Sequence, residues 1–333
     1  MINDSKNINM VKEISLIIPS HNDKKKLLQL LNSISNWEIM PNEILIIDSS
    51  IKEPSLSSDL LKYFNNNNIK VLIIHKKNMY PGHARNIGIN KSTNSMIAFL
   101  DAYTHPSNKW MLDGINHINA NNSDGVWGRT YYEANTFTAK IIRACTFGRK
   151  PIKTFPGSIL KKDIFNKCGL FIETTRAGED GDWMYRAELQ KINMCFSQQF
   201  LSYDKLNRIN IFQLLKKWFR NYSHSSKLPH RQRHKNYYYY GISIFAVLFA
   251  YNWNRILAAW DTTSIFYIPN ITKISFFSII MIYFYIRGLY LPRKKGESFM
   301  FIFPINFMFI IFLSALLDIT KTFAFIKSKF DRQ

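Results

Sequence analysis

The first hundred residues alternate between short apolar runs and longer amphipathic segments. Four apolar runs rich in β-branched residues predict buried strands, at residues 13–19, 43–48, 70–75 and 96–100. The segments between them carry apolar residues at helical spacing, at residues 23–34, 58–64 and 82–90. Strands that alternate with helices indicate a mainly parallel sheet. The pattern therefore predicts an α/β domain whose ligands bind at the carboxyl ends of the strands.

The C-terminal third has a different pattern, with three longer apolar runs at residues 238–257, 274–291 and 299–317. Each approaches the ~20 residues that a helix needs to cross the hydrocarbon core of a bilayer. The first run is interrupted near its end by Asn252, Asn254 and Arg255. We expect a transmembrane region of two to four passes after the α/β domain. The alternative is a set of buried helices in a large soluble domain.

The distribution of charge along the chain indicates which kind of partner the protein binds. The chain has 333 residues and a net charge of +21, which alone would suggest nucleic acid. The last 129 residues hold 19 Lys/Arg and four Asp/Glu, and nine of these basic residues lie in 205–236, where there is no acid. Because these charges flank apolar runs, they favour an anionic membrane surface, and we expect no nucleic-acid partner.

The flanking charges also predict an orientation. Basic loops beside apolar runs are typical of the cytoplasmic side. No signal peptide is expected, because the apolar stretch before Pro19 is only five or six residues long. We therefore expect a multi-pass protein of the cell (inner) membrane with a cytoplasmic catalytic domain. A third crossing would export the basic C-terminal tail, so a re-entrant third run is the alternative. The expected divisions are a catalytic domain at 13–204, a basic interfacial segment at 205–236 and a transmembrane region at 237–333.

Polar side chains follow the predicted strands at the edge where ligands bind. Asp48 ends the second strand, Asp101 follows the fourth, and Arg85 lies near the start of the third helix. A guanidinium there can hold phosphate oxygens, and the carboxylates can contact ribose, a base or a metal. The alternative role for each aspartate is to cap a following helix. The sequence contains neither a GxGxxG motif after the first strand nor a P-loop motif.

Six segments carry a resemblance to a known family, in the order SLIIPSHN, ILIIDSS, GHARNIGI, IAFLDAYTHP, PGSILKKDIF and AGEDGDWMYR. Over about residues 13–222 the chain resembles glycosyltransferase family 2, of a membrane-anchored bacterial type, whose members have the GT-A fold. The resemblance implies transfer of a sugar from a nucleotide-diphospho-sugar with inversion at the anomeric carbon. It implies a donor site formed by Pro19, Ser20, Asn22, Asp48, Arg85 and Asp101.

The same resemblance places the catalytic base at Asp180, within the pair Glu179-Asp180. Inverting transfer needs a carboxylate that removes the acceptor's hydroxyl proton, and cations that stabilise the departing diphosphate. The pair opens a predicted helix whose first turn, EDGDW, is acidic. The alternative is that these acids only complement the helix dipole. The resemblance favours catalysis, with Asp180 preferred over Glu179.

One position departs from the family. Its DxD motif reads Asp101-Ala102-Tyr103 here, so Tyr103 replaces the acid that the family uses as a direct metal ligand. Tyrosine is a poor ligand for Mg²⁺ or Mn²⁺. We expect a divalent metal held by Asp101 and the donor's diphosphate, with His105 as a further candidate ligand. The alternative is an enzyme that depends less on metal and more on Arg85.

The segment IFQLLKKWFRNYS, residues 210–222, resembles the amphipathic stretch that closes the family's acceptor side. Trp218 corresponds roughly to the tryptophan of the QxxRW motif of processive synthases, but Gln and Arg are not at the required spacing. We therefore expect a non-processive enzyme. The alternative role of the segment is an interfacial helix with its apolar face in the membrane.

We expect a membrane-anchored enzyme that transfers a sugar to a lipid-linked glycan acceptor in polysaccharide or cell-surface glycan biosynthesis. One alternative is a polyprenyl-phosphate sugar synthase. Another, suggested by the missing second acid of the DxD motif, is an inactive membrane scaffold that retains the fold.

Overall fold

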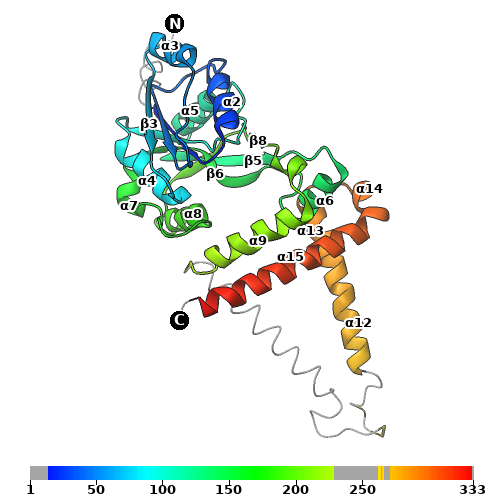
Figure 1. The fold of residues 1–333 in the computed structure, drawn as a ribbon. Helices are drawn as coiled ribbons and strands as arrows, with labels where there is room; N and C mark the ends of the chain where they lie inside the picture. Colours follow the sequence, from blue (N-terminus) through cyan, green and yellow to red (C-terminus); the bar gives the residue numbers. More distant parts are fainter. Residues whose placement is uncertain (1–13, 229–261, 264, 266–270, 332–333) are drawn as a thin grey trace. The chain divides into compact units, whose positions relative to one another are not determined.

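The computed structural model describes residues 14–228, 262–263, 265 and 271–331 (Figure 1). The chain divides into two compact units. Unit 1 comprises Met1–Lys140 and Arg149–Gln213, and unit 2 comprises Ile141–Gly148 and Leu214–Gln333.

Unit 1 is built on one mixed sheet with the strand order β3-β2-β1-β4-β6-β5-β7, in which β8 also pairs with β5. Its strands are β1 (Ile14–Ser20), β2 (Glu43–Asp48), β3 (Lys70–His75), β4 (Met96–Phe99), β5 (Gly125–Tyr132), β6 (Ile152–Lys161), β7 (Met194–Phe196) and β8 (Leu201–Tyr203). The first four strands are parallel, as predicted. Strand β6 then runs antiparallel between β4 and β5, which makes the other half of the sheet mixed.

The helices of this part of the chain are α2 (Lys24–Ile34), α3 (Ser58–Asn66), α4 (Pro81–Lys91), α5 (Trp110–Ala120), α6 (Phe137–Cys145), α7 (Ile164–Cys168), α8 (Glu179–Leu189), the 3₁₀-helix η2 (Lys205–Arg208) and α9 (Ile211–Ser225). Local chemistry accounts for two of the starts. The hydroxyl of Ser57 accepts a hydrogen bond from the Leu60 amide at the start of α3. Pro81 occupies the first turn of α4, where its missing N–H costs nothing.

The core of unit 1 has two layers, one on each face of the sheet. Successive strand residues point to opposite faces, so Leu16 and Ile18 join one buried cluster while Ile17 joins the other. Helices α2, α3 and α5 complete the first cluster, and α4, α7 and α8 complete the second (Figure 1). The strands bury nearly every residue, which is why the sequence shows them as continuous apolar runs.

The register of the parallel strands brings the site to one edge. Ser20 is paired with Asp48, and Asp48 is paired with His75. Phe99 ends β4 on the other side of β1, so Asp101 follows it at the same carboxyl edge. Residues from four separate strands therefore lie along the edge where the strands end.

The described part of unit 2 is mainly helical. Its helices are α12 (Ile271–Phe284), the π-helix η3 (Tyr285–Tyr290), α13 (Leu291–Lys294), α14 (Phe299–Ile302) and α15 (Ile305–Phe330), with the end of α6 and most of α9. The second predicted apolar run forms part of α12, η3 and α13, which follow one another without a break. The first run, 238–257, lies outside the described residues.

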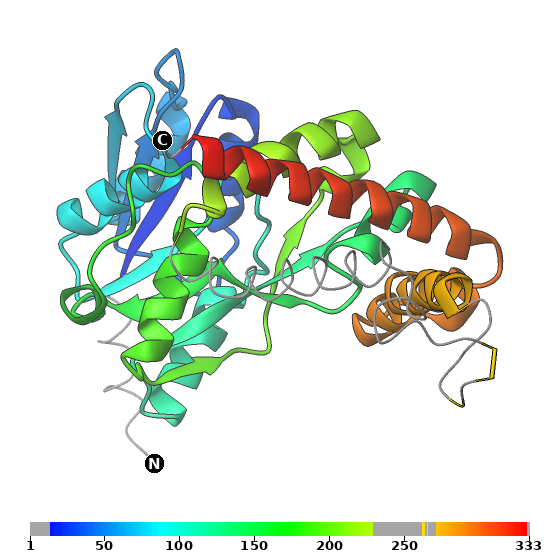
Figure 2. The same cartoon turned by 90° about the horizontal axis from the view of Figure 1, so that it is seen from below.

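The third apolar run, 299–317, does not form one continuous helix, as a membrane span would require. The chain breaks at Phe303-Pro304, because proline cannot donate within a helix, so α14 ends at Ile302 and α15 begins at Ile305. Helix α15 then continues past Leu317, through the basic tail, to Phe330 (Figure 2). Among the residues that the structure describes, α15 alone is long and apolar enough to cross a membrane, judged by length and composition.

Candidate active site

The site is organised around Arg85, whose side chain is buried in the second turn of α4. Its Nη1 donates to Oε1 of Glu179 at 2.7 Å, and its Nη2 donates to Oδ1 of Asp101 at 3.3 Å. The guanidinium carbon lies 5.7 Å and 5.6 Å from the ring centroids of Phe155 and Phe171. Arg85 therefore joins the end of β4 to the start of α8, and two aromatic rings hold its position.

A close backbone approach sets the start of α8 against α4. A Cβ on Gly82 would lie 2.3 Å from the carbonyl oxygen of Ile172 and 3.3 Å from Cγ of Glu179, so only glycine fits there. Asn86 holds the same loop, because its side chain donates to the Phe171 carbonyl and accepts from the Phe171 amide, both at 2.9 Å. This packing brings Glu179 within reach of Arg85.

Three carboxyl groups share this one cation. Burial raises the pKa of Glu179 to about 7, and the charge of Asp180 adds to the increase, while Arg85 opposes it. Burial tends to lower the pKa of Arg85, but Asp101, Glu179 and Asp180 outweigh it and raise that pKa. The guanidinium therefore stays charged, and Glu179, which is only 4% exposed, is the carboxyl that takes a proton near neutral pH.

Asp180, the predicted base, lies beside Glu179 in the first turn of α8 and is only partly buried. Its Oδ1 accepts a hydrogen bond from the Gly181 amide at 2.7 Å. This bond fixes one oxygen of the carboxylate against the helix. The structure thus places Glu179 toward Arg85 and leaves Asp180 with greater access to solvent.

The single carboxylate of Asp101 suits a metal ion that is also bound by the phosphates of a substrate. Its side chain is 39% exposed and pairs with Arg85 through one oxygen. The surrounding protein desolvates the carboxyl and raises its pKa, with Arg85 acting in the opposite direction. Mg²⁺ is commonly held by one or two carboxylates together with substrate phosphates, so the single carboxylate of Asp101 suits it.

Tyr103 and His105, which follow Asp101 in this loop, each have a contact of their own. The ring of Tyr103 lies under the Lys205 ammonium, 4.1 Å from its centroid. The backbone of His105 pairs with that of Ser202. The described part of the chain contains no group of three His, Cys, Asp or Glu side chains that could hold a metal ion.

Asp48, predicted to contact the nucleoside base, is completely buried. Its carboxylate accepts hydrogen bonds from the amide and the hydroxyl of Ser50, at 2.9 Å and 2.8 Å. It also contacts Nδ1 of His75 at 3.1 Å, and the His75 side chain is 17% exposed. Asp48 does not cap a helix, because Ser57 caps α3. His75 was not among the predicted site residues, although its position at the end of the third predicted strand was the available signal.

The end of β1 and the loop that follows it, with the predicted donor-site residues Pro19, Ser20 and Asn22, lie beside this network. Pro19 and Ser20 end β1, and the Ser20 carbonyl accepts from the Ser49 amide at 2.9 Å. Among the described residues, the buried Ser20 hydroxyl has no hydrogen-bond partner. Asn22 has a positive φ of 55°, and its amide donates to the Ser50 hydroxyl at 2.6 Å. The structure therefore brings Ser20 and Asn22 together with the turn that follows Asp48.

Trp218 belongs to unit 2, where it lies on α9. Its ring centroid is 6.0 Å from that of Phe147 and 6.3 Å from that of Tyr222. Its indole N–H is buried without a hydrogen-bond partner in the described residues. Its predicted place on the acceptor side stays a prediction.

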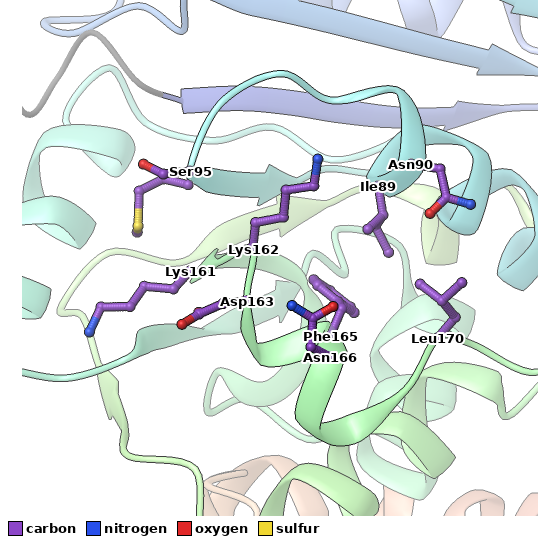
Figure 3. A pocket seen from close by; sticks show the side chains of 10 residues that line it. Ile89, Asn90, Ser95, Lys161, Lys162, Asp163, Phe165, Asn166 and Leu170 are labelled. Atoms are coloured by element: carbon purple, nitrogen blue, oxygen red, sulfur yellow. The ribbon is translucent and has the colours of Figure 1, made fainter.

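Unit 1 also contains a pocket of about 710 Å³ whose lining includes none of the predicted site residues. It lies at the start of β4, whereas Asp101 follows the end of that strand. Figure 3 shows its apolar residues Ile89, Phe165 and Leu170 beside Lys161 and Lys162. Both ammonium groups are bonded within the protein, to Asp124 and to the Ser92 carbonyl. The pocket is therefore separate from the candidate active site.

Comparison with known families gives one match. Residues 15–172 match the family model of Glycosyl transferase family 2. The matched segment includes β1 to β4, Arg85 and Asp101, and it ends before Glu179 and Asp180.

Two curated relatives illustrate the likeness. The chain is 25% identical over 222 residues to Glycosyltransferase AglE of Haloferax volcanii, an alignment that covers 62% of this chain and 71% of AglE. It is 24% identical over 196 residues to Poly(ribitol-phosphate) beta-N-acetylglucosaminyltransferase TarS of Staphylococcus aureus, covering 53% of this chain and 32% of TarS. The chain thus spans about a third of the length of TarS.

Solved structures of S. aureus TarS are similar at a lower level. The structure of its residues 1–349 has a TM-score of 0.44 and 15% identity, and it covers 63% of this chain and 64% of that chain. A complex of the same fragment with UDP-GlcNAc has a TM-score of 0.43, 16% identity and coverage of 63% and 65%.

Proposed function

We propose that this chain, whose residues 15–172 match the model of glycosyl transferase family 2, moves a sugar from a nucleotide-diphospho-sugar to a lipid-linked glycan acceptor, with inversion. The observation that carries the proposal is the centre in which Arg85 contacts both Asp101 and Glu179, next to Asp180. It combines a cation for a diphosphate with a carboxylate that can accept a proton.

Asp180 is the general base in this proposal, and Glu179 is a positioning residue. Oε1 of Glu179 is held by Arg85 at 2.7 Å, and the side chain is buried, so it cannot meet an acceptor hydroxyl. Asp180 has only one oxygen bonded within the helix. A base must come within hydrogen-bond reach of the proton that it removes, and the more accessible carboxylate satisfies this requirement.

The exposed carboxylate of Asp101 faces the donor's diphosphate, and the buried Arg85 acts on the diphosphate through its charge. The guanidinium stabilises the negative charge that develops as the sugar leaves. A divalent metal, when bound, offsets the charge of the diphosphate, and Asp101 is the residue that would hold it. This charge balance supports a metal, because a diphosphate would join three carboxyl groups around one guanidinium.

The nucleoside lies, in this proposal, against Pro19, Ser20, Asn22 and His75. Asp48 acts indirectly by accepting a hydrogen bond from Nδ1–H of His75. That tautomer leaves Nε2 as an acceptor, which suits an N–H on a nucleobase edge. Asp48 thus orients the group that contacts the base.

The acceptor and location complete the proposal. Helix α15 passes the test of length and apolarity for a membrane span, which supports association with the cell (inner) membrane. Its exposed side chains include Met308, Phe312, Phe323 and Phe330, which would lie in water without a bilayer. We retain a cytoplasmic catalytic domain at 13–204, the interfacial segment at 205–236, and a multi-pass region at 237–333. The name of TarS, which acts on poly(ribitol-phosphate), supports a glycan-type acceptor.

The test is a transfer assay with the detergent-solubilised full chain. UDP-, GDP- and TDP-sugars are screened against a membrane lipid extract, and Asp180→Asn is compared with Glu188→Gln, an exposed acid on the same helix. We expect Asp180→Asn to lower the rate by about 10²–10⁴-fold and to keep nucleotide binding in calorimetry, while Glu188→Gln changes neither. A full rate in Asp180→Asn would exclude Asp180 as the base. Absence of both turnover and nucleotide binding would favour the inactive scaffold.

A further inference from the structure

Unit 2 contains a cluster of charged side chains among its apolar helices. Arg287 in η3 contacts Asp318 of α15 through two nitrogens, Nε to Oδ2 at 2.8 Å and Nη2 to Oδ1 at 3.0 Å. Lys321, one turn further along α15, contacts Oδ1 of Asp318 at 3.1 Å. The hydroxyl of Tyr283 donates to Oδ2 at 3.1 Å. One carboxylate therefore serves three donors.

A third cation lies close enough to affect this group. Burial lowers the pKa of Lys295, and the positive charges of Arg287 and Lys321 lower it further. We call Arg287 and Lys321, which both contact Asp318, the cation cluster. It carries two positive charges and one negative charge, and Lys295 adds a positive charge at longer range. The other nearby acid, Glu297, is already paired in a buried contact with Arg143 at 2.8 Å.

The cluster is built into the packing rather than placed on flexible surface side chains. Gly288 follows Arg287, and a Cβ there would lie 2.5 Å from the Phe307 ring and 2.9 Å from Ile311, so η3 packs directly on α15. The Lys295 ammonium donates to the Thr146 carbonyl. A π-helical turn inside a helix is often found at functional sites, and here it contains Arg287.

The cluster can be reached from outside. The side chain of Arg287 is 14% exposed and that of Lys321 is 29% exposed. Large apolar side chains of α12 and η3 are exposed nearby in the chain, namely Phe277, Met281, Ile282, Tyr285 and Ile286. A soluble anion would satisfy the cations and leave these side chains in water. A lipid supplies both an anionic group and an apolar chain.

We propose that the cation cluster binds the phosphate of a polyprenyl phosphate or diphosphate lipid. Arg and Lys donors at short spacing are the usual partners of phosphate oxygens. Ionisable groups among membrane helices are expected to have such a role, because placing them there is costly. The inference rests on the proposed membrane association and extends the proposed function by locating a lipid-phosphate site.

The test measures binding of a long-chain polyprenyl monophosphate to the detergent-solubilised full chain, with and without competing inorganic phosphate. Lys321→Gln is compared with Lys329→Gln, an exposed lysine of the same helix. We expect Lys321→Gln to raise the Kd about tenfold or more, because charge-assisted hydrogen bonds are lost. We expect Lys329→Gln to change the Kd by no more than about twofold, because it removes only a screened surface charge. Lys321→Arg keeps the charge and retains binding.

The variant Asp318→Asn distinguishes a site that binds phosphate from a set of ion pairs that only stabilises the fold. Removing the carboxylate releases the donors of Arg287 and Lys321, so lipid binding stays equal or becomes tighter. If Asp318→Asn weakens binding as much as Lys321→Gln, or if Lys321→Gln matches Lys329→Gln, the inference is overturned. Competition by inorganic phosphate at the lipid's own concentration would also overturn it, since the site would then bind free phosphate.

Sugar transfer and nucleotide binding are measured on the same preparations. Loss of lipid binding in Lys321→Gln with no transfer by the unaltered chain supports the lipid site and counts against the proposed function. If the unaltered chain transfers sugar and Lys321→Gln leaves lipid binding unchanged, the proposed function is supported and the lipid site is excluded.

Discussion

Replacing Arg85 with glutamine should destabilise unit 1, and the size of the loss should depend on pH. Arg85 and Glu179 form an ion pair at 2.7 Å in which both side chains are almost fully buried. Removing one partner of a buried pair costs about 3–5 kcal/mol when the other is left charged. Asp101 contributes less, because its more exposed carboxylate remains solvated.

The pH dependence follows from Glu179, whose pKa is raised to about 7 in the folded protein. Between its ordinary pKa and about 7 the folded state binds more protons, so Glu179 itself makes folding less favourable as pH rises through this window. At pH 5.5 its carboxyl is already neutral, and Arg85→Gln then loses mainly the contacts with Phe155 and Phe171, about 1–2 kcal/mol. At pH 8.5 the substitution leaves a buried carboxylate without its cation, and the full cost applies.

Thermal unfolding of the detergent-solubilised chain, followed by tryptophan fluorescence, measures this difference. At about 2–4 °C per kcal/mol, we expect a drop in Tm of about 10 °C at pH 8.5 and about 4 °C at pH 5.5. The double variant Arg85→Gln/Glu179→Gln should recover part of the loss at pH 8.5. Arg208→Gln, which breaks an exposed pair with Asp204, should change Tm little at either pH. An equal loss at both pH values, with no recovery in the double variant, would refute this reasoning.

Three further outcomes are expected. Gly82→Ala should lower both Tm and transfer rate, because its Cβ would collide with the Ile172 carbonyl; an unchanged Tm would show that the loop can move aside. His75→Ala should raise the Kd for nucleotide about tenfold in calorimetry and should also lower Tm, because the buried Asp48 carboxylate loses one of its donors; an unchanged Kd would exclude the contact with the base. Chelation of divalent metal with EDTA should lower the transfer rate, and adding Mg²⁺ or Mn²⁺ should restore it. Asp101→Asn should lower the affinity for the metal. A transfer rate that does not respond to EDTA would exclude a role for the metal.

The elements of the first hundred residues could be predicted because their pattern is local. A buried strand such as β2 shows as a continuous apolar run, and its length is limited by turn residues on either side. The role of Asp48 could not be predicted in the same way. Its burial depends on Ser50 and on His75, which lies on a neighbouring strand. Sequence spacing alone does not state which hydrogen bonds will satisfy a carboxylate.

The course of α15 was missed for a similar reason. Asp318 and Lys321 interrupt the apolar run, so the predicted segment ended at Leu317. In the structure Asp318 is neutralised by Arg287 from a different helix, which allows α15 to continue. The break at Pro304, in contrast, was visible in the sequence and its consequence was underestimated. Long-range ion pairs therefore limit the prediction of helix ends in apolar regions.

The two charged centres of this protein carry excess charge of opposite sign. Around Arg85, three carboxyl groups share one guanidinium, and Glu179 takes a proton near neutral pH to reduce the repulsion. Around Asp318, two cations share one carboxylate, and burial together with these two positive charges disfavours the charged form of Lys295. A ligand that supplies the missing charge lowers the free energy of each folded unit. We therefore expect the first centre to bind a diphosphate donor together with a cation, and the second to bind a phosphate by itself.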